Sequence, residues 1–533
     1  MPSDDAHEPV TYTGRLGDPT TLPAVLEARA ALTPDARFVH FDGAERTFAE
    51  TLAHAERAAA TLAALGVGRG DKVALMLPNS LEFLDLWFGA ALLGAVLVPV
   101  NTGLKGEGLR YVVEHSDAAV VAVDAPLREA YETACGTGGP ARRLLRGTDA
   151  PVAGWEPLAA ALAGGHASAP RADVRPGDLA SVLYTSGTTG PPKGVMNGHN
   201  AYPTAGFEFA QRHVRVRADD VLYTSLPLFH VNAQMLTTIG ALVSGVPMVL
   251  APRFSASGFF DDARARGATV FNYIGAMLTM LFKQPERPDD ADNPLRLTVG
   301  GAAPAELWPA FERRFGLDVL EIYGLTETAT FCLGSPPDDV RVGKLGVPVS
   351  WAEVEVRRPD GAVADPGEAG EIAIRATRPD VLFQGYYKAP EATADAMAGG
   401  WFHSGDRGRR DADGYFVFLD RIKDTIRRRG ENISSYEVER VVNSHPAVAE
   451  SAAVGVPSDL GEEDVMIVVV ARGEEAPDPA ELVAFCEERL AAFMVPRYVR
   501  VRAALPKTAT QRVQKFSLRA EGAAGAWDRQ APV

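Results

Sequence analysis

Hydrophobic and polar positions follow two alternating periods in the first part of the chain. Residues 52–67 (LAHAERAAATLAALGV) and 82–95 (EFLDLWFGAALLGA) have the periodicity of helices, and residues 72–78 between them (KVALMLP) are typical of a buried strand. Further short apolar runs precede polar or glycine-containing loops; these are Val221–Leu226, Pro247–Ala251 and Val319–Tyr323. The pattern predicts an α/β fold, in which ligands bind at the ends of strands.

The pattern changes near Arg421. Residues 438–448 and 479–491 are typical of helices, and residues 463–472 and 495–505 are typical of strands. This arrangement predicts a second, compact α/β unit. We place the domain boundary within Asp420–Lys423, which gives an N-terminal domain of residues 1–420 and a C-terminal domain of residues 421–533. The tail from Ala520 is rich in alanine and glycine, and we expect it to fray.

Composition narrows the class of protein. The chain has 533 residues, of which 46% are hydrophobic and 23% are charged, as in ordinary globular proteins. A net charge of −16 argues against a nucleic-acid partner. The longest apolar run, Leu86–Val100, is too short for a membrane span and contains Pro99. Three dispersed cysteines and a polar, acidic N-terminus without a signal-like pattern predict a cytoplasmic protein.

The stretch Tyr184–Val195, YTSGTTGPPKGV, has the composition of a phosphate-binding loop. It is not a Walker A motif, because counting from Gly187 places Pro192 where the second glycine belongs and Gly194 after Lys193. Free backbone N–H groups, hydroxyl donors and one cation nevertheless suit a polyphosphate. The alternative is a flexible surface turn.

Six further motifs follow one another along the chain. They are LPLFHVN (226–232), GGAAP (300–304), YGLTETAT (323–330), GWFHSGDRG (400–408), DRIKDTIRRRGENISSYEVE (420–439) and LPKTATQRVQK (505–515). Together with the phosphate loop they resemble the adenylate-forming superfamily of acyl-CoA synthetases, luciferases and adenylation domains. The resemblance covers nearly the whole chain. It is strongest to the branch of carnitine/crotonobetaine-CoA ligase-like and medium-chain acyl-CoA synthetases.

This resemblance implies a large N-terminal α/β domain, a smaller mobile C-terminal α+β domain and a two-step reaction. MgATP converts a carboxylic acid to an acyl-adenylate with release of pyrophosphate, and the acyl group passes to CoA. ATP, Mg²⁺ and CoA are therefore the expected cofactor and co-substrates. In relatives the small domain rotates between the two steps, so one site serves both.

The resemblance also implies the ATP site. Tyr323 stacks on adenine, Thr326 donates to the α-phosphate, Glu327 binds Mg²⁺, and Asp406 accepts the ribose hydroxyls with Arg421 beside it. The alternative for Asp406 is a turn residue. The implied ATP-binding residues are Thr185, Ser186, Gly187, Thr188, Thr189, Gly190, Lys193, Gly301, Ala302, Ala303, Tyr323, Gly324, Thr326, Asp406 and Arg421.

The acyl and CoA sites follow from the same resemblance. The implied acyl-binding residues are Phe229, His230, Tyr273, Gly275, Gly300 and Gly324, and the implied CoA-binding residues are Arg429, Gly430 and Glu431. The implied catalytic residues are Arg512, His230, Thr326, Glu327 and the hinge residue Lys423. The alternatives are a merely packed His230 and a solvated face for the arginines of residues 427–429.

The last motif departs from the family pattern. Gln511-Arg512 stands where relatives have Gly-Lys, and that lysine normally bridges the carboxylate and the α-phosphate. Arginine keeps the charge but is planar and longer, so slower adenylation is one expected consequence. Lys507 and Lys515 lie nearby, and the register favours Arg512.

Three functions remain open from the sequence. The first is a CoA ligase, and the second is an adenylate-forming enzyme with another acceptor, such as a carrier-protein thiol, an amine or nitrite-type diazotisation. The third is a binding or regulatory protein without turnover, which the presence of Lys193, Glu327 and Asp406 disfavours. A medium apolar, aromatic or quaternary-ammonium acid is compatible with the pocket residues. Any carrier protein would be a separate chain, and a homodimer is the default oligomer.

Overall fold

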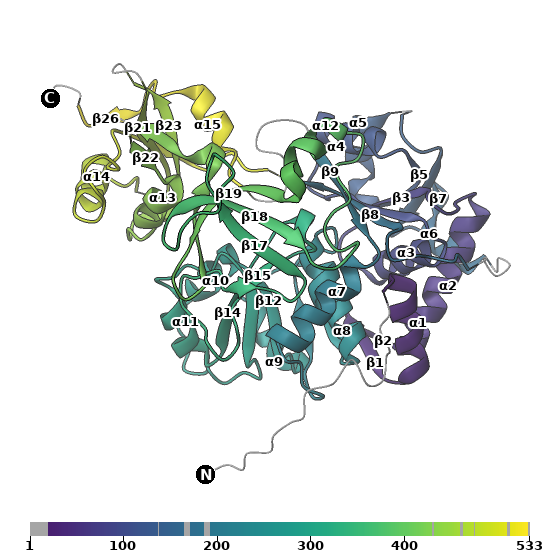
Figure 1. Ribbon diagram of the computed structural model, residues 1–533. Helices are drawn as coiled ribbons and strands as arrows, with labels where there is room; N and C mark the ends of the chain where they lie inside the picture. Colours follow the sequence, from purple (N-terminus) through teal and green to yellow (C-terminus); the bar gives the residue numbers. More distant parts are fainter. Residues whose placement is uncertain are drawn as a thin grey trace, which may run out of the picture. The chain divides into compact units, whose positions relative to one another are not determined.

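The computed structural model describes residues 20–136, 138–164, 171–185, 192–428, 431–458, 462–473, 475–508 and 512–530. These residues form two compact units (Figure 1). Unit 1 comprises the described residues within 20–185, 192–354 and 374–402, and unit 2 those within 355–373 and 403–530. The domain boundary between residues 420 and 421 stays a prediction.

Two largely parallel sheets form the framework of unit 1. In the described residues the first sheet has the order β16 (Val347–Pro348), β15 (Leu333–Gly334), β14 (Asp318–Tyr323), β13 (Leu297–Gly301), β12 (Val270–Ile274), β10 (Leu222–Thr224), β11 (Met248–Leu250), β1 (Arg37–Phe41) and β2 (Ala44–Thr47). The second has the order β7 (Glu156–Pro157), β6 (Arg142–Arg146), β5 (Ala118–Asp124), β3 (Lys72–Met76), β4 (Val96–Pro99), β8 (Leu179–Thr185) and β9 (Lys193–Gly198).

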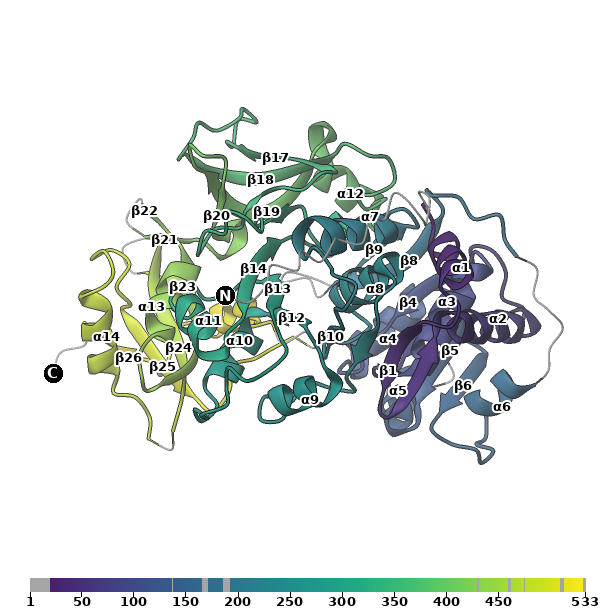
Figure 2. The ribbon, with the colours of Figure 1, turned by 90° about the horizontal axis from the view of Figure 1, so that it is seen from below.

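Helices separate and cover these sheets. Helix α7 (Ala201–Phe207) contacts β9 of the second sheet, and the π-helical turn η4 (Asn232–Thr238) contacts β10 and β12 of the first. Helices α1 (Leu22–Leu32), α2 (Phe48–Ala64) and α3 (Leu81–Leu92) lie side by side (Figures 1 and 2). The hydroxyl of Thr47 and the carboxylate of Glu50 form a capping box that starts α2.

Shorter helices complete unit 1. They are α4 (Gly106–His115), η2 (Ala125–Leu127), α5 (Arg128–Cys135), α6 (Leu158–Ala163), η3 (Glu208–His213), α8 (Ile239–Ser244), α9 (Phe259–Arg266), α10 (Gly275–Phe282), α11 (Trp308–Phe315), η5 (Thr326–Thr328), α12 (Pro390–Ala396) and η6 (Ala398–Gly400). The predicted α/β alternation is confirmed, since residues 52–67, 72–78 and 82–95 fall on α2, β3 and α3. None of the helices in the described ranges is long and apolar enough to cross a membrane.

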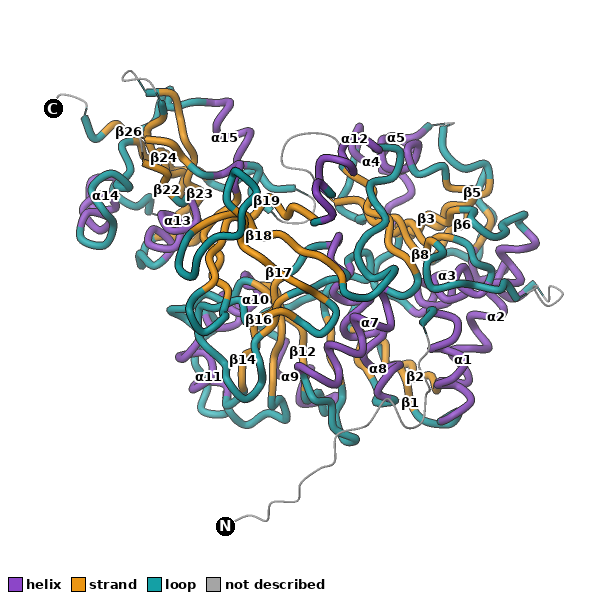
Figure 3. The backbone as a smooth tube through the Cα atoms, in the orientation of Figure 1, coloured by secondary structure: helices purple, strands orange, loops and turns teal. Residues whose placement is uncertain are grey.

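Unit 2 is built on the sheet β23 (Val448–Pro457), β24 (Glu463–Ala471), β25 (Tyr498–Arg502) and β26 (Trp527–Asp528). Strand β24 alternates: Val465, Ile467 and Val469 pack with α13 (Ser435–Asn443) and α14 (Pro479–Glu487). Met466 and Val468 pack with Leu518 of α15 (Lys515–Glu521) on the other face. Figure 3 shows α15 on the opposite side of these strands from α13 and α14.

Unit 2 also contains β20 (Phe416–Arg421), η7 (Ile422–Asp424), β21 (Ile426–Arg428) and β22 (Glu431–Ile433). A further sheet consists of β17 (Ala352–Arg357), β18 (Ala369–Ala376), β19 (Phe402–Arg410) and β20. The chain passes from one unit to the other within β17, β18 and β19. The expectation of a frayed tail is wrong for residues 520–530. Trp527 pairs with Val499, and Asp528 forms an ion pair with Arg497 at 3.2 Å.

Candidate functional site

Strands β8 and β9 present the ends of the predicted phosphate loop in unit 1. Thr185 pairs with Lys193 across the antiparallel register, and its hydroxyl donates to the carbonyl of Lys193 at 3.4 Å. Both predicted ATP residues therefore lie at adjacent strand ends. The other predicted residues of this loop, Ser186, Gly187, Thr188, Thr189 and Gly190, lie outside the described residues.

Tyr386 connects Lys193 with Glu327. The ammonium nitrogen of Lys193 lies 4.5 Å from the centre of the Tyr386 ring, and the Tyr386 hydroxyl donates to Oε1 of Glu327 at 3.0 Å. Burial, and the nearby Glu327 carboxylate, raise the pKa of Tyr386, so its hydroxyl stays a neutral donor. The chain segment reaches this place because the N–H of Tyr387 donates to the carbonyl of Gly194 at 2.8 Å.

The YGLTE motif forms a tight turn after β14. Tyr323 ends the strand, and Thr326 and Glu327 begin η5, where the side chain of Thr328 accepts from the Leu325 N–H at 2.8 Å. Gly324 is required by close backbone approach, because a Cβ there would lie 2.2 Å from the carbonyl oxygen of Thr330. The turn thus carries a half-buried tyrosine and, four positions later, a buried carboxylate.

Glu321 fixes the backbone of the GGAAP loop. Its carboxylate accepts from the N–H groups of Ala302 at 2.6 Å and Ala303 at 3.0 Å, and from the hydroxyl of Tyr273 at 2.8 Å. Ala302 has a positive φ of 66°, which is costly for a residue with a Cβ. Burial raises the pKa of Glu321 to about 7, although these three donors oppose the rise.

Two of the glycines predicted to bind the acyl group are required by backbone packing. A Cβ at Gly275 would lie 1.9 Å from the carbonyl oxygen of Ala302, and a Cβ at Gly300 would lie 2.0 Å from that of Tyr273. Gly301 ends β13 beside them. Close approach between neighbouring backbones, rather than pocket space alone, therefore demands glycine at both positions.

The LPLFHVN segment is held by Asn79. The side chain of Asn79 accepts from the N–H of Leu228 at 2.8 Å and donates to the carbonyls of Leu226 and Ala251. Phe229 and His230 follow with ring centres 4.7 Å apart, and both are half-buried. These contacts orient the two predicted acyl-binding rings at the carboxyl end of β10.

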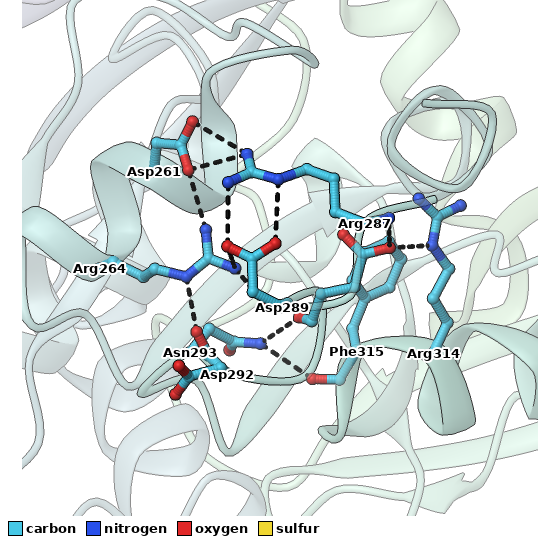
Figure 4. A network of polar contacts seen from close by, with 9 residues as sticks. Asp261, Arg264, Arg287, Asp289, Asp292, Asn293, Arg314 and Phe315 are labelled. Carbon is cyan, nitrogen blue, oxygen red and sulfur yellow. Dashed lines mark hydrogen bonds and ion pairs between the residues drawn. The ribbon is translucent and has the colours of Figure 1, made fainter. Parts of the chain in front are cut away.

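A polar network holds the segment after helix α10 (Figure 4). Arg314 is half-buried; it pairs with the buried Asp290 at 2.6 Å and donates to the carbonyls of Phe282 and Gln284 at 2.5 and 3.0 Å. Arg287 adds exposed ion pairs with Asp261 and Asp289. The network fixes the C-terminal end of α10, whose N-terminal end carries Gly275.

In unit 2, Asp406 and Arg421 are paired across β19 and β20. The Nε of Arg421 lies 3.3 Å from Oδ1 of Asp406, and Asp406 is buried. Glu371 accepts from the N–H of Gly405 at 2.9 Å, and the Ser404 hydroxyl accepts from the N–H of Asp406 at 3.1 Å. The strands therefore bring together the two residues predicted for the ribose.

The predicted hinge and CoA loop begin directly afterwards. Lys423 lies in η7 and is exposed. Arg428 is buried, pairs with Asp464 at 3.0 Å and donates to the carbonyls of Phe493 and Val495, so it stabilises unit 2. Arg429 and Gly430 lie outside the described residues, and of Glu431 only the backbone in β22 is described.

Three cations lie near the end of the last motif. Lys507 pairs with Glu450 at 2.6 Å, and Lys515 pairs with Glu439 at 2.8 Å and donates to the Ser435 hydroxyl at 2.6 Å. Arg512 is exposed, and its backbone exchanges two hydrogen bonds with Thr508. Both lysines have carboxylate partners within unit 2, and the assignment of Arg512 stays a prediction.

Sequence reasoning missed Tyr386, Glu321 and Asn79. Tyr386 and Asn79 lie outside the quoted motifs, and Glu321 stands two residues before one of them. An acidic residue inside the apolar run Val319–Tyr323 was the one available signal for Glu321.

The sequence of this chain is similar to those of known protein families and enzymes. The AMP-binding enzyme family matches residues 26–387, and the AMP-binding enzyme C-terminal domain matches residues 437–512. The chain is 34% identical over 467 residues to the crotonobetaine/carnitine-CoA ligase of Salmonella typhi, covering 85% of this chain and 89% of the relative. It is 35% identical over 511 residues to the sulfoacetate-CoA ligase of Cupriavidus necator, covering 93% and 97%.

The fold is also similar to that of a synthetase with known structures. The o-succinylbenzoate-CoA synthetase of Bacillus subtilis, in complex with its acyl-adenylate intermediate, is 27% identical and gives a TM-score of 0.83, covering 93% of this chain and 97% of that one. The same synthetase in complex with ATP and magnesium ion gives a TM-score of 0.80, covering 93% and 98%.

Proposed function

The chain belongs to the AMP-binding enzyme family, and from this premise we propose how its residues convert a carboxylic acid, ATP and CoA into acyl-CoA, AMP and pyrophosphate. The adenylate-forming fold, with a large α/β and a small C-terminal domain, is confirmed, and so is the class of acyl-CoA synthetase. The acid itself, and the role of each residue, belong to the proposal.

The contact chain Lys193–Tyr386–Glu327 carries the assignment of the phosphate side. It places a cation over the ring of one tyrosine and a buried carboxylate at the hydroxyl of the same residue. A carboxylate is a hard oxygen ligand, so Glu327 fits Mg²⁺, and Lys193 fits a phosphate oxygen. Mg²⁺, when bound, supplies positive charge that offsets the repulsion between the acid and the triphosphate. Tyr386 keeps the two protein groups apart and oriented.

Adenylation needs a carboxylate oxygen to attack the α-phosphorus and pyrophosphate to leave. Lys193 and Thr326 would stabilise the charge that develops on the phosphate oxygens. Tyr323 and the loop of Ala302 and Ala303 would hold adenine, because Glu321 keeps that loop rigid. Arg512 would supply a further cation from unit 2, and Asp406 would accept the ribose hydroxyls.

Product analysis tests this function. Purified protein is incubated with MgATP and a panel of carboxylic acids, with and without CoA, and the products are identified by mass spectrometry. We expect acyl-CoA and AMP with CoA, and acyl-adenylate and pyrophosphate without it. Formation of AMP without any thioester in the presence of CoA would point instead to a carrier thiol, an amine or nitrite-derived chemistry as acceptor.

Arg512→Lys tests the departure in the last motif. If arginine slows adenylation, the variant releases pyrophosphate faster than the wild type, whereas unchanged or slower release refutes that role. Arg502→Lys is the matched control, because Arg502 lies in the same unit and forms an exposed ion pair with Glu521. The control should leave both half-reactions unchanged.

Three further assignments belong to the proposal alone. A cytoplasmic location, a homodimeric state and a separate carrier protein as alternative acceptor follow from sequence reasoning. Size-exclusion chromatography with light scattering tests the oligomeric state.

A further inference from the structure

Two asparagines form a hydrogen-bonded amide pair between β12 and η4. Asn272 lies on β12 and is only 1% exposed, and its Nδ2 donates to Oδ1 of Asn232 at 2.8 Å. Asn232 begins η4 and is half-buried. The Oδ1 atom of Asn272 is buried and has no hydrogen-bond partner among the described residues.

The two asparagines are close in sequence to residues predicted to bind the acyl group. Asn232 follows His230 by two positions, and Asn272 directly precedes Tyr273. Neighbouring side chains in β12 point to opposite faces. The Tyr273 hydroxyl bonds to Glu321 on one face, whereas Asn272 meets η4 on the other. The register places Val299 of β13 next to Asn272 and Gly301 next to Ile274, so the described β13 side of Asn272 offers its side chain no polar partner.

An unpaired acceptor in such a place is energetically costly. Burial of a polar atom without its hydrogen bond costs about 1–3 kcal/mol, and an apolar side chain at this position would avoid this cost. Buried polar atoms are nearly always paired in native proteins, so an exception calls for a partner. Asn232 satisfies the amide nitrogen of Asn272, and a donor on a molecule bound against β12 and η4 can pair with its oxygen.

We propose that the acid activated by this enzyme carries a hydrogen-bond donor on its carbon chain, a hydroxyl or amino group, that bonds to Oδ1 of Asn272. This inference rests on the proposed function, because it places the acyl chain against β12 and η4. It selects polar-substituted acids over plain aliphatic acids of the same size. Asn232 is the positioning residue, because its carbonyl oxygen fixes the orientation of the Asn272 amide.

Isosteric acids test the inference. Pyrophosphate release without CoA is measured for sets of three acids matched in heavy atoms: one with a hydroxyl group, one with a methyl group, and one with an ether or keto oxygen at the same position. Sets cover straight chains and hydroxybenzoate-like rings. One hydroxy acid should exceed its methyl isostere about 10- to 100-fold in kcat/KM, which corresponds to about 1–3 kcal/mol.

Variants assign the preference to the amide. Asn272→Leu should lower the hydroxyl-to-methyl ratio at least about tenfold, because leucine cannot accept a hydrogen bond. Asn232→Ala is a second, milder variant on a half-buried position and should lower the same ratio. Asn197→Leu is the matched control: Asn197 is fully buried on β9, and both of its side-chain polar atoms have no partner in the described ranges. It should keep the wild-type ratio.

The outcomes separate the two claims. Equal or better activity with methyl isosteres overturns the inference while leaving the ligase function intact. A preference for the ether or keto acids overturns the assignment of a donor. If no acid in the panel yields pyrophosphate or acyl-CoA, the proposed function fails, and the inference fails with it.

Discussion

Glu321 offers a sharp test of how the GGAAP loop, which we propose holds adenine, is fixed in place. The carboxylate is buried and accepts three hydrogen bonds, from Ala302, Ala303 and Tyr273. Substitution by glutamine keeps the size and removes the titration. The side-chain amide offers one acceptor oxygen, and its NH₂ group faces a backbone N–H, so one loop hydrogen bond is lost. The variant therefore separates the effect of charge from the effect of volume.

The magnitude follows from the pKa. The pKa of Glu321 rises from 4.5 to about 7 in the folded protein. A folded-state pKa above the unfolded value means that the folded state binds the proton more tightly. The associated stability is fully present below pH 4.5 and is lost as the pH rises through 7. The whole difference corresponds to about 3 kcal/mol, of which about 2 kcal/mol falls between pH 5 and pH 8.

Urea unfolding of the wild type and Glu321→Gln at pH 5 and pH 8 measures this difference. Tryptophan fluorescence suits unit 1, because Trp527 is the single tryptophan of the six that lies in unit 2. We expect the unfolding free energy of the wild type, relative to the variant, to fall by about 2 kcal/mol from the lower to the higher pH. Parallel curves for the two proteins would refute the reasoning.

The same variant should raise the KM for ATP more than it lowers kcat, because we propose that the loop holds adenine and does not touch the reacting carboxylate. Glu312→Gln is the matched control. Glu312 also accepts a backbone N–H, that of Val319 at 3.0 Å, together with the indole N–H of Trp308 at 2.9 Å. These contacts do not touch the loop, so the control should leave the KM for ATP unchanged.

Three further predictions concern unit 1. Tyr386→Phe removes the hydroxyl that orients Glu327, and we expect about a tenfold loss of kcat/KM for ATP in a pyrophosphate-release assay. Gly324→Ala introduces a Cβ at 2.2 Å from a backbone oxygen, so it should reduce adenylation more than about tenfold, and wild-type rates would contradict the tight turn. Arg314→Gln breaks a buried ion pair and should lower the unfolding free energy by about 3 kcal/mol, whereas Arg287→Gln, on an exposed pair, should lower it by less than about 1 kcal/mol in urea denaturation.

Hydrophobic periodicity was sufficient to predict the helices and strands, and the motifs were sufficient to predict the family. Both predictions depend only on short stretches of sequence. The helices and strands predicted for residues 52–95 and 463–491 match α2, β3, α3, β24 and α14. Motif order then implied the adenylate-forming fold. The contacts that hold the motifs could not be predicted in this way. Tyr386 reaches Glu327 across 59 positions, and Asn79 reaches Leu228 across 149.

Amino-acid composition predicted the burial of two segments less well than the position of each residue in its strand. The tail from Ala520 is rich in small residues, yet Trp527 pairs with Val499, and Arg497 holds Asp528. Likewise, of the two described arginines in the run 427–429, Arg428 is buried against Asp464 and two carbonyl groups, whereas Arg427 is exposed. In both segments a single strand register decides which residues are exposed, and the overall composition does not contain that information.

The glycines around the acyl region show how backbone packing and specificity are linked. Gly275 and Gly300 are needed because their neighbours Ala302 and Tyr273 approach to within van der Waals distance of the missing Cβ. They therefore cannot be exchanged to tune pocket size without moving the loop that Glu321 holds. Substrate choice must then depend on side chains that point away from this packing, and Asn272 on the opposite face of β12 is one of them. We therefore expect substitutions that change the polarity of residue 272 to alter substrate specificity more readily than substitutions that enlarge Gly275 or Gly300.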